Sequence, residues 1–193
     1  MAIDDVRVIS NIATGETGIL LANHLAQGKA KVTLIIGPVN VSSINKKIRL
    51  INFKFFGELR DIIKKELRTH KYEVIIHSAA VADFKPKHQV KGKISSNHPR
   101  VLRLIPLSKI IRDIRRLALS AKLVMFKLEC GVSDAILQQR ARIAADKFKA
   151  DLIVTCRLNP YRAFILSKDG KPIFARSKVD LTRKVAKLII TKI

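Results

Sequence analysis

Two hydrophobic periodicities alternate along the chain, and this alternation predicts an α/β fold. Residues 31–36 and 73–77 are short, β-branched runs typical of buried strands, whereas residues 16–27 and 55–67 repeat apolar positions at helical spacing. Strands that alternate with helices indicate a mostly parallel sheet with helices on both faces. Such a sheet binds its ligands at the carboxyl ends of its strands.

The rest of the chain continues this pattern and ends in a hairpin and a helix. Further strands are predicted at 48–53, 101–105, 123–128 and 151–155, further helices at 109–117, 134–148 and 178–190, and a hairpin at 162–175. Ser108 and Ser177 are predicted to cap two of the helices. Residues 83–100 are polar, basic and interrupted by two prolines, which predicts a long loop. No repeat or linker divides the chain, so we expect one domain over residues 1–193.

Composition narrows the class of protein. An apolar fraction of 48% over 193 residues is enough for a sizeable core and argues against general disorder. No apolar run approaches the roughly 20 residues that span a bilayer, and the first residues lack the features of a signal peptide. Cys130 and Cys156 form neither a disulfide framework nor a metal-binding motif. These observations favour a cytoplasmic protein that is not bound to a membrane.

The net charge of +23 is unusually high. No acidic residue lies between Thr17 and Gly57, and none between Phe84 and Arg112, where eight lysines and arginines occur. A field of this sign attracts anions such as phosphorylated metabolites, nucleotides or nucleic acid. A general basic bias of the source proteome explains the excess equally well, because the charge is spread along the chain.

The N-terminal stretch 3–18, I-D-D-V-R-V-I-S-N-I-A-T-G-E-T-G, is the first candidate site. A strand-like apolar piece leads into a turn of small residues and then into the helix 16–27. The first N–H groups of a helix have no internal partner, and the helix dipole favours negative charge there, so this turn is a candidate anion site. On its own, the same pattern is also typical of an ordinary turn before a helix. The candidate residues are Arg7, Asn11, Ala13, Thr14 and Gly15.

Two further candidates follow the strand 73–77. Residues 78–84, S-A-A-V-A-D-F, are small enough to let a nucleotide approach the backbone, and Asp83 can accept from a base or a sugar hydroxyl. Tight strand packing and a turn-forming aspartate account for the segment as well. Ten residues on, Lys93 lies in G-K-I-S-S on the predicted loop. A positioned ammonium stabilises the negative charge that develops when a triphosphate activates a carboxylate, although most loop lysines are simply solvated.

Taken together, these motifs resemble the phosphopantothenoylcysteine synthetase family of coenzyme A biosynthesis. The stretch 3–18, the segment S-A-A-V-A-D-F, the lysine of G-K-I-S-S and F-K-L-E at 126–129 occur in the family's order. The resemblance runs from Ile3 to the last helix and implies a Rossmann-like three-layer α/β sandwich with a flap or antiparallel extension. The sequence has no G-x-G-x-x-G, which argues against an ordinary dinucleotide dehydrogenase.

The resemblance also implies roles for particular residues. Asn11 and Lys93 match catalytic positions, holding an acyl carbonyl and stabilising charge. Arg7 and the turn Ala13-Thr14-Gly15 match the part that takes phosphate. The nucleotide site is expected to consist of Ala80, Asp83, Phe126 and Lys147.

The implied reaction is the ligation of 4′-phosphopantothenate to L-cysteine through an acyl-nucleotide intermediate. CTP or ATP would be the co-substrate, Mg²⁺ would accompany it, and the protein would form a homodimer without a nucleic-acid partner. The alternative is a degenerate, non-catalytic protein of the same fold that binds a nucleotide or nucleic acid. A fusion with a flavin-dependent decarboxylase has no support within these residues.

This sequence departs from the family in two places. The family has Ala-Asn where this chain has Thr155-Cys156-Arg157, and it has a first strand and a glycine loop ahead of Ile3. That strand is central in the family's sheet. We therefore expect either that residues 2–9 shift into its place or that the chain as written has low stability.

Overall fold

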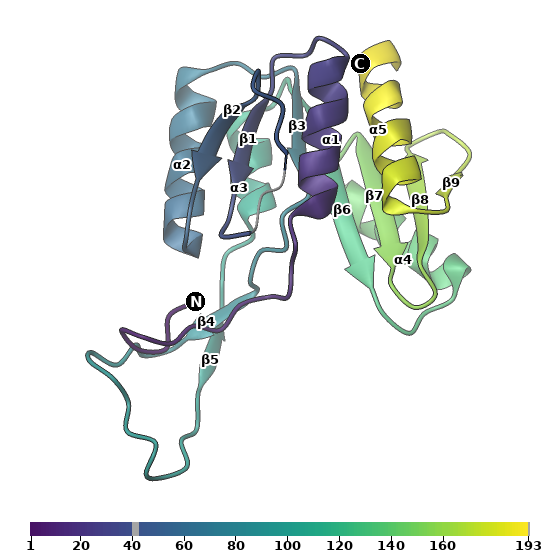
Figure 1. Cartoon of the computed structure of the whole chain (residues 1–193). Coiled ribbons are helices and arrows are strands. Elements are labelled where there is room, and N and C mark those ends of the chain that lie inside the picture. The colour runs from purple at the N-terminus through teal and green to yellow at the C-terminus, as the bar shows by residue number, and fades with distance from the viewer. Residues whose placement is uncertain (40–42, 193) are drawn as a thin grey trace.

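The computed structural model describes residues 1–39 and 43–192 and confirms the α/β fold (Figure 1). In chain order the elements are α1 (Glu16–Gln27), β1 (Thr33–Ile36), β2 (Arg49–Asn52), α2 (Phe56–Thr69), β3 (Val74–His77), β4 (Phe84–Pro86), β5 (Leu104–Pro106), α3 (Ile110–Leu117), β6 (Lys122–Glu129), α4 (Asp134–Phe148), β7 (Leu152–Arg157), β8 (Arg162–Ser167), β9 (Ile173–Ala175) and α5 (Lys178–Lys192).

The main sheet has the strand order β3-β6-β7-β8-β9. β3, β6 and β7 are parallel, and the predicted hairpin adds β8 and β9 as antiparallel strands. β1 and β2 form a separate parallel pair, and β4 pairs with β5 in an antiparallel arm. The fold therefore has the mostly parallel sheet and the antiparallel extension that the sequence predicts.

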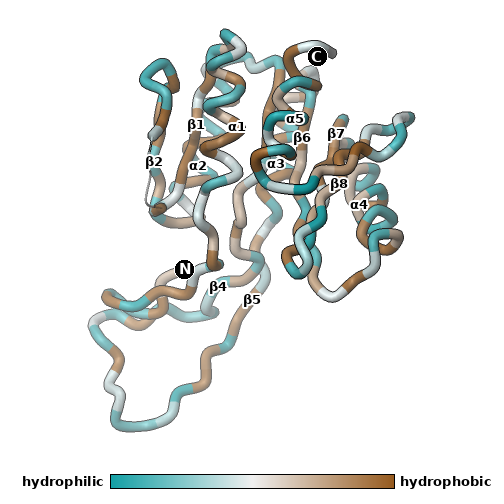
Figure 2. Tube along the Cα trace, turned by 45° about the vertical axis from the view of Figure 1, so that its right-hand side comes forward, coloured by the Kyte–Doolittle hydropathy of each residue, from teal (hydrophilic) through white to brown (hydrophobic). Residues whose placement is uncertain are grey.

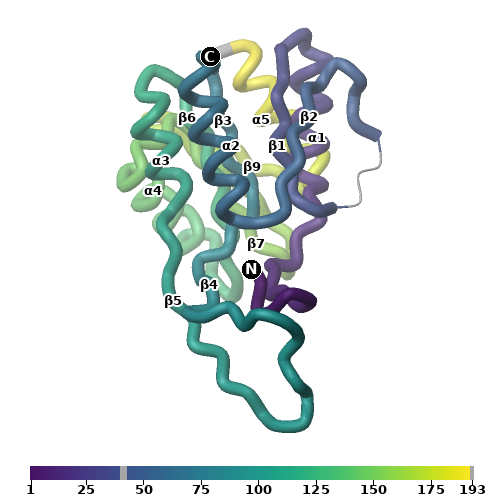
Figure 3. The backbone as a smooth tube through the Cα atoms, turned by 90° about the vertical axis from the view of Figure 1, so that its left-hand side faces the viewer, coloured from purple at the N-terminus to yellow at the C-terminus, as the bar shows by residue number. Residues whose placement is uncertain are grey.

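Helices cover both faces of the sheet, as Figures 1 and 3 show. α1 and α5 lie on one face, and α2, α3 and α4 lie on the other. Successive strand residues point to opposite faces, so Val124 of β6 packs toward α1 and α5 while Leu123 packs toward α2, α3 and α4. Both side chains are almost completely buried, which gives the domain two apolar clusters separated by the sheet.

The sheet is divided between β1 and β3. These strands follow one another across the molecule in Figure 1, yet among the described residues each pairs only on its far side, β1 with β2 and β3 with β6. All four residues of β3 are only partly buried, whereas Val124 and Val154 on the neighbouring strands are 0% exposed. An inner parallel strand is normally enclosed on both faces, so β3 has the exposure of an edge strand although it lies in the middle of the order.

The N-terminal segment does not fill this gap. The strand-like piece expected around Val6–Ile9 is wrong, because it forms only an isolated antiparallel bridge between Ala2 and Val8. Val6 and Val8 are exposed, and the N–H groups of Ile3 and Ile9 bond within the segment, to carbonyls of Arg7 and Met1. The segment lies by the arm instead of between β1 and β3 (Figure 1). Of the two outcomes expected from the sequence, the shift of residues 2–9 into the sheet does not occur.

A polar network ties the two parts of the sheet together at the amino ends of the strands. The Tyr72 hydroxyl, just before β3, donates to Glu66 of α2 at 2.7 Å and lies 3.3 Å from the hydroxyl of Thr33 in β1. Glu66 also accepts two bonds from Arg49 of β2, at 2.7 and 2.9 Å. These bonds from Arg49 are the main reason that the pKa of the buried Glu66 carboxyl is lowered. The Glu66 carboxylate thus joins α2 to β2 and to the residue before β3, and Tyr72 extends this network to β1.

The arm replaces most of the predicted long loop. Residues 84–86 pair with residues 104–106, and the segment between them extends away from the helices and the sheet (Figures 1 and 3). Hydrophobic and hydrophilic residues alternate along the arm, as the brown and teal stretches of Figure 2 show. Its most exposed large apolar residues are Phe84, Val90, Val101 and Leu104.

The two predicted helix caps have different outcomes. The hydroxyl of Ser177 accepts from the Asp180 N–H at 3.1 Å, which confirms the cap of α5. The predicted cap at Ser108 is wrong, because α3 begins at Ile110 and its N-cap is Lys109, without a side-chain cap bond. The strand predicted at 101–105 is also shorter and later than expected.

We predict that a strand added ahead of Met1, with a short glycine loop, stabilises the protein. Buried unpaired backbone groups cost about 1–3 kcal/mol each, and a gain of roughly 2 kcal/mol raises the melting temperature of a domain of this size by about 4–8 °C. The matched control carries proline in the middle of the added strand, where it removes a ladder donor. Equal melting temperatures for the original, extended and proline-containing chains would show that the gap needs no strand.

Candidate functional site

The turn before α1 lies at the carboxyl ends of the strands and is closely packed. Gly15, the N-cap of α1, has φ 72°, a left-handed conformation that favours glycine. A Cβ on Gly15 would lie 2.9 Å from the side chain of Val39 in the segment after β1. A Cβ on Gly18 would lie 3.5 Å from the Ser78 hydroxyl after β3. The first turn of α1 is therefore held between the ends of β1 and β3.

The N-cap of α1, Gly15, has no side chain that could accept from the first turn of the helix. The Thr14 hydroxyl accepts from the Glu16 N–H at a long 3.4 Å. Ala13 and Thr14 are exposed, so an anion can approach the N–H groups from solvent. The start of α1 is thus open to solvent, as an anion site there requires, and anion binding by Ala13, Thr14 and Gly15 stays a prediction.

Asn11 connects this turn to the segment after β3. Its Nδ2 donates to the carbonyl oxygen of Ala80 at 3.0 Å, across 69 residues of sequence. Both residues are exposed at the carboxyl edge of the sheet. The structure therefore brings together two motifs that the sequence analysis treats separately. Asn11 keeps a second amide hydrogen and its carbonyl oxygen for a ligand.

Asp83 lies at the base of the arm and forms an ion pair with Lys109, the N-cap of α3. Both side chains are about half exposed, so the pair can open toward solvent. Phe126, on β6, lies one position beyond the stretch of β6 that pairs with β3 and packs partly against the cluster under α1 and α5. These two predicted nucleotide-site residues belong to the same edge as Asn11 and Ala80.

Lys147 is not brought to this edge. It lies in the last turn of α4, which leads into the amino end of β7. Because α4 runs back across the sheet, its last turn lies at the opposite end from the carboxyl ends of the strands. The lysine is exposed, and its Nζ lies 5.9 Å from the ring centroid of Phe148. Its predicted contact with a nucleotide phosphate has no support from this placement.

Arg7 does not lie free beside the turn either. Its guanidinium donates to the carbonyl of Ile94 at 2.7 Å and lies 3.7 Å from the Asp4 carboxylate. Arg7 thus contacts the middle of the arm, next to Lys93. Lys93 itself is exposed on the arm.

Asp4 is the residue whose part sequence reasoning missed. Its carboxylate is buried and accepts from the N–H groups of Val6, Arg7 and Ile94, at 2.9, 2.7 and 3.0 Å. The bond from Ile94 is the largest reason that its pKa is lowered. Asp4 therefore fixes the strand-like N-terminal segment to the residue that follows Lys93. The sequence signal that could have revealed this role is the position of Asp4 in the I-D-D-V-R pattern.

The end of β7 adds a second group of polar residues to the edge. Cys156 is half-buried, and burial raises the pKa of its thiol, as expected for a packing residue and not for a nucleophile. Burial also raises the pKa of Tyr161 to about 12. Across the edge, Lys178 Nζ of α5 lies 2.5 Å from Glu16 Oε2 of α1.

The candidate site is an open surface. Two cavities lie away from it. One, of about 240 Å³, lies along α1 and α5, and the other, of about 360 Å³, lies beside β2 and α2. Within residues 1–39 and 43–192, no group of three or more His, Cys, Asp or Glu side chains is placed to hold a metal ion. Over the same residues, no helix has both the length and the apolar character needed to cross a membrane.

Comparison with known families agrees with this arrangement. The family model described as DNA/pantothenate metabolism flavoprotein C-terminal domain matches residues 1–192. The chain belongs to this family.

Curated relatives of this flavoprotein C-terminal domain are longer proteins. The coenzyme A biosynthesis bifunctional protein CoaBC of Thermococcus kodakarensis is 35% identical over 162 residues, which are 84% of this chain and 39% of that protein. The protein of the same name from Borreliella burgdorferi is 30% identical over 196 residues, which are 97% of this chain and 49% of that protein. The chain thus spans less than half the length of these two relatives.

Solved structures of similar proteins share the fold. A DNA/pantothenate metabolism flavoprotein from Streptococcus pneumoniae superposes with a TM-score of 0.87 at 24% identity, covering 97% of this chain and 93% of that one. A Cab2 variant in complex with phosphopantothenate-cysteine superposes with a TM-score of 0.80 at 17% identity, covering 100% of this chain and 83% of that one. At these identities the likeness shows the family's fold alone.

His77 supplies a test of how tightly this edge is enclosed. It ends β3, and burial lowers its pKa to about 4, from an ordinary value near 6.5. The unfolded chain then binds the proton more readily, so the stability contributed by neutral His77 is complete above about pH 6.5 and is lost as the pH falls toward 4.

We predict that His77→Gln removes part of the acid sensitivity of the fold. Between pH 7 and pH 4.5, the free energy of unfolding should fall by about 2 kcal/mol less in this variant than in the wild type. Urea titrations at each pH measure this difference, and the exposed His88, changed to Gln, is the matched control. Parallel pH profiles for the wild type and His77→Gln would contradict the burial of His77.

Proposed function

We propose that the chain joins 4′-phosphopantothenate to L-cysteine, with CTP or ATP as co-substrate, as a step of coenzyme A biosynthesis. The observation that carries the proposal is the bond from Asn11 to Ala80, because it unites the two motifs of the resemblance at one edge of the sheet. The names of the curated relatives, and the phosphopantothenate-cysteine held by the Cab2 variant, support the same reaction class.

The reaction proceeds in two steps. A carboxylate oxygen of phosphopantothenate attacks the α-phosphorus of the nucleotide, and pyrophosphate leaves. The cysteine amine then attacks the acyl carbon, loses a proton, and displaces the nucleoside monophosphate. A free carboxylate has a poor leaving group. The first step replaces it with a nucleoside monophosphate, which leaves readily when the amine attacks.

The chain's residues contribute positions and charge to these steps. Asn11 donates its second amide hydrogen to the acyl carbonyl, adding no charge near the phosphates. The exposed N–H groups at the start of α1, next to Gly15, bind phosphate oxygens. Asp83 and Ala80 contact the nucleotide, with Phe126 beneath it. Lys93 reaches the reacting centre when the arm folds toward the edge, and stabilises the negative charge there.

Mg²⁺ is part of the proposal as a companion of the triphosphate. This ion is usually bound by phosphate oxygens and waters together with one or two carboxylates. Asp83 and Glu16 are carboxylates at this edge; Asp83 is the one in the proposed nucleotide site, and its side chain is 59% exposed. The ion would neutralise phosphate charge.

A homodimer is also part of the proposal. The arm exposes Phe84, Val101 and Leu104, and Ile12 near the site is fully exposed. Apolar side chains gathered on a projecting segment are typical of a surface that another chain covers. A second copy that covers the arm would place its own surface close to Lys93.

We predict that Asn11→Asp lowers the rate of ligation at saturating substrate by roughly 10–100-fold, because a carboxylate repels the phosphates and cannot donate to the acyl carbonyl. The assay follows phosphopantothenoylcysteine formed from phosphopantothenate, cysteine and CTP or ATP. Asn52→Asp, an exposed change on the outer strand β2, is the control. If Asn11→Asp turns over at the wild-type rate, Asn11 does not have the proposed catalytic role. If the wild-type chain binds nucleotide but forms no product, the non-catalytic alternative is favoured.

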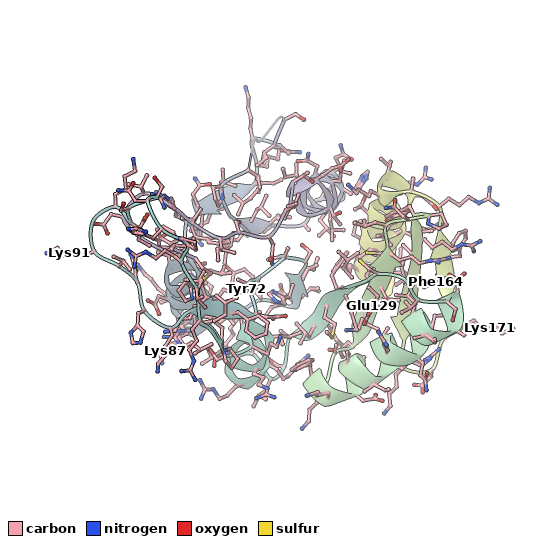
Figure 4. All side chains as sticks on the ribbon, turned by 90° about the horizontal axis from the view of Figure 1, so that it is seen from below. Tyr72, Lys87, Lys91, Glu129, Phe164 and Lys171 are labelled. Atoms are coloured by element: carbon pink, nitrogen blue, oxygen red, sulfur yellow. The ribbon has the colours of Figure 1, made fainter. Side chains whose placement is uncertain are left out.

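We predict that ligand protects the arm from trypsin. Lys87 and Lys91 project from the arm, whereas Lys171 lies on the far side of the molecule (Figure 4). Nucleotide together with phosphopantothenate should slow cleavage at the arm severalfold and leave cleavage at Lys171 unchanged. An arm cut at the same rate with and without ligand would mean that Lys93 does not move to the substrate.

A further inference from the structure

Two helices begin side by side at the carboxyl edge of the sheet. α1 and α5 pack along one another on the same face (Figure 1), and their first residues form an ion pair. Lys178 Nζ donates to Glu16 Oε2 at 2.5 Å, although 162 residues separate them in sequence. Glu16 directly follows Gly15, so the ammonium of Lys178 is held next to the turn that is proposed to bind phosphate.

The two helix starts differ in how their N–H groups are satisfied. The Ser177 hydroxyl caps α5, whereas the N-cap of α1 is Gly15, which has no side chain, and the Thr14 hydroxyl accepts from the Glu16 N–H only at a long 3.4 Å. In α1, Glu16 provides the negative charge that the helix dipole favours in a first turn. In the state described, a carboxylate therefore lies where an anionic ligand would bring its own charge.

The pair between Lys178 and Glu16 can exchange partners. The Lys178 side chain is 37% exposed and the Glu16 side chain is 49% exposed. A pair with this exposure is worth little, typically under about 1 kcal/mol. A phosphate carries more negative charge than a carboxylate and more acceptor atoms, so it competes well for the ammonium.

The surroundings of Lys178 also place it at the site. Burial raises the pKa of the Cys156 thiol, and the nearby ammonium of Lys178 opposes that shift, so the ammonium lies by the end of β7. Arg7, the cation that the sequence analysis assigns to phosphate, is instead engaged with Asp4 and the carbonyl of Ile94. The ammonium of Lys178 therefore lies beside the first turn of α1, whereas Arg7 contacts the middle of the arm.

We propose that Lys178 is a positioning residue for phosphate at the start of α1, and that Glu16 holds its ammonium there until the anion binds. The inference rests on the proposed function for the identity of the molecule that carries the phosphate. That carrier is either phosphopantothenate, a phosphate monoester, or the nucleoside triphosphate. In both cases Lys178 leaves Glu16 and donates to a phosphate oxygen.

The test compares three variants of the full chain, each first shown to melt cooperatively. Lys178→Met removes the ammonium, and Lys187→Met makes the same change at an exposed position farther along α5. Glu16→Gln removes the competing carboxylate and keeps the ammonium. Calorimetry measures the binding of phosphopantothenate and of the triphosphate separately, at low and moderate salt.

The proposal expects opposite effects from the two partners of one ion pair. Lys178→Met should weaken binding of one of the two phosphates by about 3–10-fold and reduce its salt dependence, as expected for the loss of one partly exposed charged contact. Glu16→Gln should bind that phosphate at least as tightly as the wild type, and Lys187→Met should match the wild type. In the ligation assay, Lys178→Met should raise the KM of the affected substrate more than it lowers kcat. The ligand whose affinity falls identifies the carrier.

A purely structural pair gives a different pattern. In that case Lys178→Met and Glu16→Gln lose similar amounts of stability and bind both phosphates with wild-type affinity, which overturns the proposal. A wild-type chain that binds neither phosphate overturns it as well. If the chain binds triphosphate through Lys178 but forms no product, the proposed ligation fails and this inference stands. If it ligates and Lys178→Met has wild-type KM values, the inference fails and the ligation stands.

Discussion

Backbone hydrogen bonding between the strands is the constraint on which the rest of this structure depends. Within residues 1–39 and 43–192, β1 and β3 do not pair, so other contacts join the parallel β1–β2 unit to the main sheet. α1 packs on both parts, through Ala22 against the cluster over β1 and through Leu21 against the cluster over β6. On the opposite face and at the amino ends of the strands, Glu66 joins β2, α2 and the residue before β3. Side-chain packing and the buried Glu66 carboxylate thus take the place of backbone hydrogen bonds between β1 and β3.

This arrangement gives α1 two roles. It bridges the divided sheet, and its uncapped first turn is the candidate phosphate site. There is little room for a side chain at Gly15, next to Val39, and Gly18 lies near Ser78, so the turn is close to the ends of both β1 and β3. A change in the spacing of β1 and β3 would therefore move the candidate site.

The buried carboxylate of Asp4 has a similar importance for the arm. It receives N–H bonds from its own segment and from Ile94, so the residue after Lys93 is anchored while Lys93 itself stays exposed. The arm is thus anchored to the N-terminal segment at its middle, and it is basic along its length. Of these basic groups, Lys178 lies next to the start of α1, where phosphate is proposed to bind.

The sequence by itself determined most element types and indicated the edge that holds the candidate site. Periodicity reports local burial and backbone preference, so it predicted α1, β1 and α4, and the motifs around Asn11 and Asp83 indicated the carboxyl ends of the strands. It could not decide which strands pair, because pairing depends on contacts between residues far apart in the chain. Only the tertiary structure showed that β1 and β3 are left apart, that Arg7 holds the arm, that Lys147 lies at the opposite end of the sheet, and that Lys178 meets Glu16. Each of these facts depends on where a helix or strand runs in space, and no short stretch of sequence contains that information.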